Sequence, residues 1–166
     1  QAAGEDRILV PSPSVPTYDL EPAMSAAGIT GHLIESLTAG KHNVIICNFA
    51  NADMVGHTGQ LQATVAAVET LDQCLARIIV AAGKVDATVM ITADHGNADD
   101  MAERNNKTGE IIRDSSGLMV PKTSHSLNPV PFFAVLPEGY KDEFVVRQLE
   151  GSTLANLAAT TLTLLG

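Results

Sequence analysis

Long apolar runs are absent from this sequence. No stretch approaches the roughly 20 consecutive apolar residues that a membrane-spanning helix needs, so a helical membrane anchor is not expected. Tryptophan is also absent, and only 4% of the residues are aromatic although 45% are hydrophobic. A core built from Ala, Val, Leu and Ile is typical of a sheet covered by helices. The composition therefore favours the α/β class over an all-β sandwich.

Basic residues and cysteines are few as well. The formal net charge of -9 disfavours partners such as nucleic acid or an anionic membrane surface. It does not exclude a small anionic substrate, because bound divalent cations would reverse the local field. Cys47 and Cys74 are too few for a disulfide framework, and we expect a reducing compartment, the cytoplasm. The start, Gln1-Ala2-Ala3-Gly4, has neither an initiator Met nor a signal peptide, so we expect part of a longer polypeptide.

Hydrophobic periodicity predicts alternating strands and helices. Residues 44–49 and 87–92 are nearly continuous apolar runs, typical of strands buried on both faces. Between them, apolar residues recur every three or four positions over residues 61–82, which predicts a long helix ending at Gly83. This order predicts a right-handed crossover in a parallel sheet. Weaker patterns predict a strand at residues 8–10, a helix at 30–38, a hairpin joining 110–113 to 118–120, a strand at 131–136 and a last helix capped by Ser152 and Thr153.

Residues that can bind a metal follow the two central predicted strands. Asp53 and His57 come after the first strand, and Asp94 and His95 come after the second. Ligands of open α/β sheets bind outside the carboxyl ends of the strands, so we expect the two pairs to converge. His125 lies in a polar segment before a third predicted strand, in what we interpret as a solvated loop.

Each of these residues also has an ordinary explanation. An Asp-x-x-x-His spacing arises by chance, a lone histidine is usually a surface residue, and Asp94-His95-Gly96-Asn97 could be a turn with a helix cap. Together, however, carboxylates and imidazoles suit manganese, zinc or iron better than calcium. Five ligands are too few for two closed coordination shells, which indicates catalytic rather than structural sites.

Other polar residues are interpreted without a functional role. His32 and His42 are predicted to be surface residues, with no acidic partner that suggests a site, and both cysteines to be packing residues. Three acidic residues are expected to favour the start of a helix: Asp99, Asp100 and Glu103. The sequence contains no Gly-rich phosphate loop, no zinc CxxC pair and no Gly-x-Ser-x-Gly elbow.

Five segments in this order resemble the cofactor-independent (2,3-bisphosphoglycerate-independent) phosphoglycerate mutases. They are Val10-Pro11-Ser12-Pro13, with Thr17-Tyr18-Asp19-Leu20-Glu21-Pro22 after it, then Asn51-Ala52-Asp53-Met54-Val55-Gly56-His57, Thr92-Ala93-Asp94-His95-Gly96-Asn97 and His125-Ser126-Leu127-Asn128-Pro129. The resemblance implies a three-layer α/β/α sandwich around a mostly parallel sheet, in the alkaline phosphatase superfamily. Residues 1–166 would be the C-terminal segment of the metal-binding phosphatase-type domain, with the inserted transferase domain and the N-terminal strands outside this chain.

The resemblance also implies an activity and a ligand set. The family interconverts 3-phosphoglycerate and 2-phosphoglycerate through a phosphoserine, with two divalent ions and without 2,3-bisphosphoglycerate. Asp53, His57 and His125 would hold one ion, and Asp94 and His95 would help to hold the other. Manganese is expected first, with cobalt, magnesium and zinc as alternatives.

The implied serine nucleophile lies outside this chain, so no catalytic or substrate-binding residue is assigned within it. The chain is expected to be inactive alone, with the rest of the same polypeptide and a phosphoglycerate substrate as its partners. Two alternatives remain open. One is a phosphopentomutase or a metal-dependent phosphatase of the same superfamily, against which the His125-Ser126-Leu127-Asn128 segment argues. The other is a non-enzymatic metal-binding domain.

Overall fold

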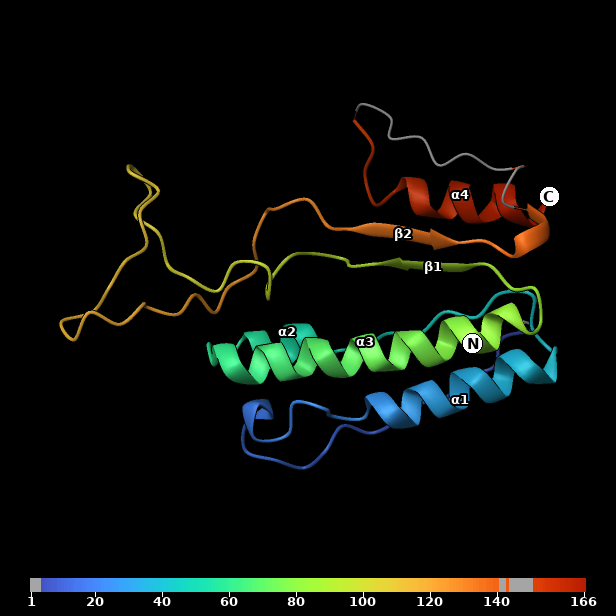
Figure 1. The fold of residues 1–166 in the computed structure, drawn as a ribbon, viewed down its shortest axis with the longest axis horizontal. Helices are drawn as coiled ribbons and strands as arrows, with labels where there is room; N and C mark the ends of the chain where they lie inside the picture. Colours follow the sequence, from blue (N-terminus) through green and yellow to red (C-terminus); the bar gives the residue numbers. More distant parts are fainter. Residues whose placement is uncertain (1–3, 141–142, 144–150) are drawn as a thin grey trace.

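The computed structural model describes residues 4–140, 143 and 151–166. In Figure 1, α4 lies on one side of the pair β1–β2, and α1 and α3 lie on the other side. The described elements are α1 (Ala26–Ala39), α2 (Asn51–Gly56), α3 (Leu61–Gly83), β1 (Val89–Thr92), β2 (Phe132–Val135) and α4 (Asn156–Leu165), with 3-10 turns at Tyr18–Leu20 and Glu138–Tyr140. None of the helices in these ranges has the length and apolar character needed to cross a membrane.

Helix α3 forms the centre of the helical layer and contacts both α1 and α2. Its buried face contains small and medium side chains, including Ala67, Cys74 and Ile78, which allow neighbouring helices to approach closely. The predicted helix over residues 61–82 is confirmed and ends one residue later. Helix α1 begins four residues before the predicted start, and Gly40 ends it in the left-handed conformation, with φ of 61°.

Strands β1 and β2 are antiparallel neighbours, with Val89 opposite Val135 and Thr92 opposite Phe132. Both lie inside the strands predicted from the sequence. Because the two strands run in opposite directions, the carboxyl end of β1 lies beside the amino end of β2. The segment after β1 and the segment before β2 therefore meet at one end of the sheet.

Residues 44–49 differ from the prediction of a strand buried on both faces. Within the described ranges they join no strand ladder, so the predicted right-handed crossover between two parallel strands is not formed there, and Ile46 is 91% exposed. Cys47 is exposed too, so its interpretation as a packing residue is wrong. The predicted strand at residues 8–10 is also absent, and Leu9 is 92% exposed. An apolar run becomes a strand only where a neighbour pairs with its backbone, and no described segment does so here.

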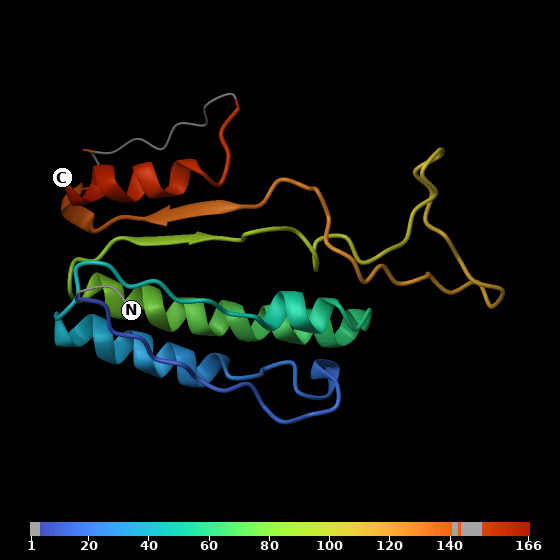
Figure 2. The same cartoon turned by 180° about the vertical axis from the view of Figure 1, so that it is seen from behind.

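Residues 101–122 form an excursion that projects away from the helices, drawn in yellow to orange in Figure 1 and seen from behind in Figure 2. Isolated antiparallel bridges hold it together, with Ala102 opposite Pro121 at its base and Arg113 opposite Met119 further out. The predicted hairpin is therefore confirmed. No helix begins at Asp99, contrary to the prediction. The chain turns there instead, with the Asp100 N–H donating to the Asn97 carbonyl at 3.2 Å.

The start of α4 also differs from the prediction. The cap position is Ala155, which offers no side-chain hydrogen bond. Thr153 lies two residues earlier, and its N–H donates to Asn156 Oδ1 at 2.8 Å. Asn156, the first residue of the helix, therefore contributes a polar side chain to its own first turn.

Candidate metal centre

Helix α2 presents the first two candidate ligands. Residues 51–56 form a short helix that was not predicted from the sequence, and His57 is the residue that ends it. The spacing of four residues puts Asp53 and His57 on the same face, and Asp53 Oδ1 lies 3.2 Å from His57 Nε2. The buried Asn51 amide anchors this helix by donating to the carbonyl oxygens of Pro22 at 2.8 Å and Ala23 at 2.9 Å.

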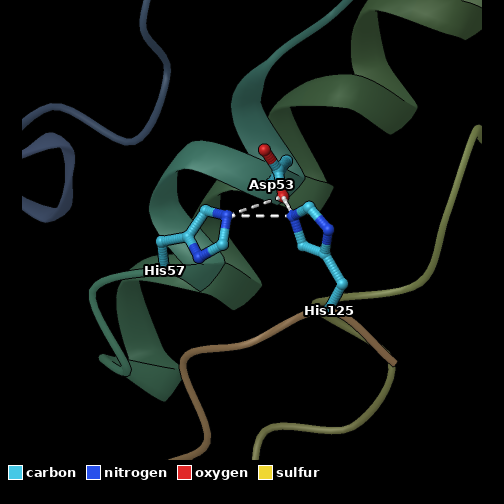
Figure 3. A group of neighbouring side chains, drawn as sticks. All are labelled: Asp53, His57 and His125. Atoms are coloured by element: carbon cyan, nitrogen blue, oxygen red, sulfur yellow. Dashed lines mark hydrogen bonds and ion pairs between the residues drawn. The ribbon is translucent and has the colours of Figure 1, made fainter. Parts of the chain in front are cut away.

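His125 completes a compact group with these two residues, although it is far away in sequence. Its Nε2 lies 3.2 Å from Asp53 Oδ1 and 3.1 Å from His57 Nε2. Figure 3 shows the two rings pointing toward each other and toward the carboxylate. The three donor atoms all lie within 4.8 Å of one another. His125 reaches this position because the Ser126 N–H donates to the Gly96 carbonyl at 2.8 Å, in an isolated bridge beyond the end of β1.

One hydrogen bond determines the tautomer of His57. Its Nδ1 lies 2.6 Å from the Thr123 carbonyl oxygen. A carbonyl can only accept, so Nδ1 carries a proton, and in the neutral ring Nε2 then carries the lone pair. That lone pair faces Asp53 and His125, which is the orientation that a metal-binding histidine needs.

The spacing and chemistry of the group fit a divalent ion. A tetrahedral ion with bonds of about 2.0–2.1 Å has neighbouring ligands about 3.3–3.4 Å apart. The observed separations are 3.1–3.2 Å. The side chains of Asp53, His57 and His125 are 34%, 38% and 46% exposed, so one side of the group is open to water or a ligand. Two imidazoles and one carboxylate suit a transition metal better than calcium.

The second predicted pair lies directly beside this group. The His95 ring stacks on the His125 ring, with centroids 3.6 Å apart and planes 17° apart. Asp94 Oδ2 lies 3.6 Å from His95 Nε2, and the Asp94 side chain is 86% exposed. The five predicted residues thus come together at the end of β1. Within the described ranges, only Asp53, His57 and His125 gather as three potential ligands of a single ion.

Sequence reasoning missed the polar residues behind the ligands. Asn97 is 5% exposed, and its amide donates to Asp53 Oδ1 at 2.7 Å. Asp99 accepts hydrogen bonds from Ser126 Oγ at 2.9 Å and Asn128 Nδ2 at 2.6 Å. Burial opposes ionisation of Asp99, but the hydrogen bonds from Asn128 and Ser126 hold the pKa of this carboxyl below its ordinary value. The one sequence feature that could have indicated a role for Asn97 was its position three residues after the candidate ligand Asp94.

The other two histidines each lie near a single acidic side chain. His42 Nε2 lies 2.9 Å from Asp6 Oδ2, and His32 Nδ1 lies 3.5 Å from Glu35 Oε2. Neither histidine belongs to the group around Asp53. A hollow of about 450 Å³ opens beside that group, lined by Pro16, Thr17, Tyr18, Asp19, His57, Thr58 and Gln60.

The sequence of the whole chain matches a known family of metal-dependent proteins. The profile of the metalloenzyme superfamily aligns with residues 1–166. The chain belongs to the metalloenzyme superfamily. Its fold is accordingly of the alkaline phosphatase-like α/β type, as the sequence predicted. A gathered set of one carboxylate and two imidazoles is in keeping with a metalloenzyme family.

Curated members of the superfamily with similar sequences are phosphoglycerate mutases. The 2,3-bisphosphoglycerate-independent phosphoglycerate mutase of Cellvibrio japonicus (strain Ueda107) is 46% identical over 162 residues, and mutase 2 of Methanosarcina acetivorans is 47% identical over 163 residues. Each alignment covers 98% of this chain and 28% of the relative. A crystal structure of Leishmania mexicana phosphoglycerate mutase at low cobalt concentration superposes with a TM-score of 0.90 and 44% identity, covering 95% of this chain and 28% of that one.

Proposed function

We propose that this chain is the C-terminal, metal-binding segment of a 2,3-bisphosphoglycerate-independent phosphoglycerate mutase, which interconverts 3-phosphoglycerate and 2-phosphoglycerate. The observation that carries the proposal is the gathered group of Asp53, His57 and His125 in a chain 46% identical to such a mutase over 162 residues. The inserted transferase domain, the serine nucleophile and the N-terminal strands would belong to the rest of the same polypeptide. The chain would therefore be inactive by itself.

In this proposal the five candidate ligands form two adjacent ion sites. Asp53, His57 and His125 hold one ion, and Asp94 and His95 supply part of the shell of the other. The carboxylate of Asp53 provides negative charge, and His57 keeps its Nε2 lone pair available because its Nδ1–H is engaged with Thr123. When bound, two divalent ions would neutralise phosphoryl oxygens and lower the pKa of an attacking hydroxyl.

Manganese is the proposed metal, with cobalt, magnesium and zinc as alternatives. The mixed nitrogen and oxygen donors support a transition metal over calcium. No 2,3-bisphosphoglycerate is required, because the serine would carry the phosphoryl group between the two hydroxyls of the same glycerate. We propose the cytoplasm as the compartment, in keeping with the unpaired Cys47 and Cys74.

The reaction is tested with the full-length protein and manganese. We expect interconversion of 3- and 2-phosphoglycerate without added bisphosphoglycerate, and no phosphate exchange on pentose phosphates. Activity on pentose phosphates alone would show that the protein is a phosphopentomutase and not a phosphoglycerate mutase. Simple release of phosphate would indicate a phosphatase. Metal binding with no turnover of any of these substrates would indicate a non-enzymatic domain.

The ligand roles are tested by single substitutions. Asp53→Ala and His125→Ala should each remove most mutase activity and weaken manganese binding. His32→Ala, which removes an imidazole outside the group, should change neither. Wild-type activity and affinity in the Asp53→Ala variant would refute the assignment of the first ion site.

A further inference from the structure

The turn formed by residues 96–99 lies directly behind the first group of ligands. It follows His95 without interruption, so it is continuous with the second pair of candidate ligands. Two of its side chains, Asn97 and Asp99, make contacts across long separations in sequence. Asn97 contacts Asp53 in α2, and Asp99 contacts the segment that carries His125.

Asn97 fixes the carboxylate of Asp53. Its Nδ2 donates to Asp53 Oδ1 at 2.7 Å and to the Asp53 carbonyl oxygen at 3.3 Å. Both partners are acceptors, so rotating the amide by half a turn would bring its oxygen against two oxygens. Asn97 Oδ1 is buried and accepts no hydrogen bond from the described part of the chain. The two hydrogen bonds that orient the amide therefore both go to Asp53.

Asp99 fixes the backbone next to His125. Its carboxylate accepts hydrogen bonds from Ser126 Oγ and from Asn128 Nδ2, the residues one and three positions after His125. The Ser126 N–H is bound by the Gly96 carbonyl at 2.8 Å. The segment carrying His125 is therefore held at two points by the same turn. His125 itself stays free to direct its Nε2 toward Asp53.

The close fit around this turn depends on two glycines. A Cβ added at Gly56 would lie 2.5 Å from Asn97 Oδ1, and one added at Gly96 would overlap Ser126 Oγ in the 123–128 segment and lie 2.6 Å from Asp99 Oδ1. Contacts this short are not tolerated by real side chains, so α2 and the 123–128 segment approach the turn only because no Cβ intervenes. The turn thus fixes the distance between Asp53 and His125.

We propose that Asn97 and Asp99 are positioning residues that set the affinity and geometry of the first ion site, Asn97 through Asp53 and Asp99 through His125. This rests on the proposed binding of a metal by Asp53, His57 and His125. Residues that orient ligands in this way typically change metal affinity about 10- to 100-fold when they are removed. The same turn would connect the two ion sites, because it continues from Asp94 and His95.

The test is a cobalt titration of the full-length protein, followed by the visible absorption spectrum of the bound ion and by calorimetry. Asn97→Ala and Asp99→Ala should each weaken cobalt binding by about 10- to 100-fold and alter the spectrum. Thr30→Ala is the control for the first variant, because it also truncates a fully buried hydrogen-bonding side chain, but one in α1, where Thr30 Oγ1 donates to the Ala26 carbonyl. Asp100→Ala is the control for the second, since Asp100 pairs with Lys122 and Arg104.

Both controls should keep the wild-type affinity and spectrum even where they lower stability. Wild-type affinity and spectrum in Asn97→Ala and Asp99→Ala, or equal losses in the controls, would overturn the proposal. Asp99 is exposed, so Asp99→Ala leaves no buried cavity and decides the question even if Asn97→Ala does not fold. The titration uses no phosphoglycerate. A protein that shows the expected losses but lacks mutase activity would support the positioning role and refute the proposed reaction.

Discussion

Single side chains in this protein take their orientation from partners far away in the sequence. His57 is oriented by the Thr123 carbonyl, and Asp53 is oriented by the Asn97 amide. The residue types at positions 53, 57, 94, 95 and 125 were predictable, because carboxylates and imidazoles at strand ends indicate metal binding. The partners were not predictable, because a backbone carbonyl or an Asn amide has no distinctive sequence pattern. Asp99 was assigned to a helix start for the same reason.

Gly96 should tolerate no side chain. Gly96→Ala places a methyl group 2.6 Å from Asp99 Oδ1, and we expect overpacking to cost about 1–3 kcal/mol of unfolding free energy. The measurement is urea unfolding. The control is Gly31→Ala inside α1, where no other atom lies within 4 Å of the added Cβ. Its higher helix propensity should instead stabilise the protein by about 0.5–1 kcal/mol. A neutral Gly96→Ala would contradict the close contact.

Asp100 should stabilise the protein in a pH-dependent way. The hydrogen bond from Lys122 lowers the pKa of the Asp100 carboxyl, burial opposes this, and the charges of Lys122 and Arg104 add to the lowering. A folded-state pKa below the unfolded value of about 3.9 gives a contribution that is complete well above that pH. It is lost as the pH falls through the folded-state pKa.

Unfolding of the wild type and of Asp100→Asn should therefore be compared from neutral pH into acid. We expect the wild type to be more stable near neutrality and the difference to shrink in acid. A difference that grew on acidification would have the wrong sign and would exclude the Lys122 interaction as its source.

At the scale of secondary structure, the local pattern predicted helices better than strands. Helix α3 was predicted almost to the residue, because its apolar period repeats over six turns and its hydrogen bonds lie within the segment. Residues 44–49 have an equally apolar sequence but form no strand within the described ranges. A strand depends on a partner that its own sequence does not specify. Helix α2 was missed because it is only six residues long and contains glycine.

The face of α3 that contains Ile78 should determine the stability of the helical layer. Ile78 is 4% exposed, so Ile78→Ala should leave a cavity and cost about 2–5 kcal/mol in urea unfolding. The control is Val80→Ala two residues later, at a position that is 62% exposed. Its effect should stay within about 0.5 kcal/mol. Similar costs at both positions would mean that the contacts of α3 with its neighbours do not dominate stability.

At the scale of the whole molecule, metal binding should couple to folding. The group of Asp53, His57 and His125 exists only when α2, the 96–99 turn and the 123–128 segment are in place, so an ion that binds it stabilises the folded state. In the full-length protein, manganese at about 100 times its dissociation constant should add about 2.7 kcal/mol to the unfolding free energy. A chelator should remove this gain.

The gain should also depend on pH, since an imidazole must be neutral to bind a metal. Thermal unfolding with and without manganese at about pH 8 and pH 5 is the measurement, and we expect the shift in midpoint to be smaller at the lower pH. In the His57→Ala variant, manganese should shift the unfolding midpoint only slightly at both pH values. An equal shift at both pH values in the wild type would argue against imidazole ligands.

The projecting excursion of residues 101–122 offers a practical use. Its base is held next to the site by the bridge between Ala102 and Pro121. Its outer turn at residues 114–118 is closed by the Asp114 side chain, which accepts hydrogen bonds from the backbone N–H groups of Ser116 and Leu118. Changes at that outer turn would not be transmitted past the base. An epitope or a fluorophore inserted between Ser115 and Ser116 would therefore label the protein without disturbing the candidate ligands. An insertion at the base of the excursion would disturb them.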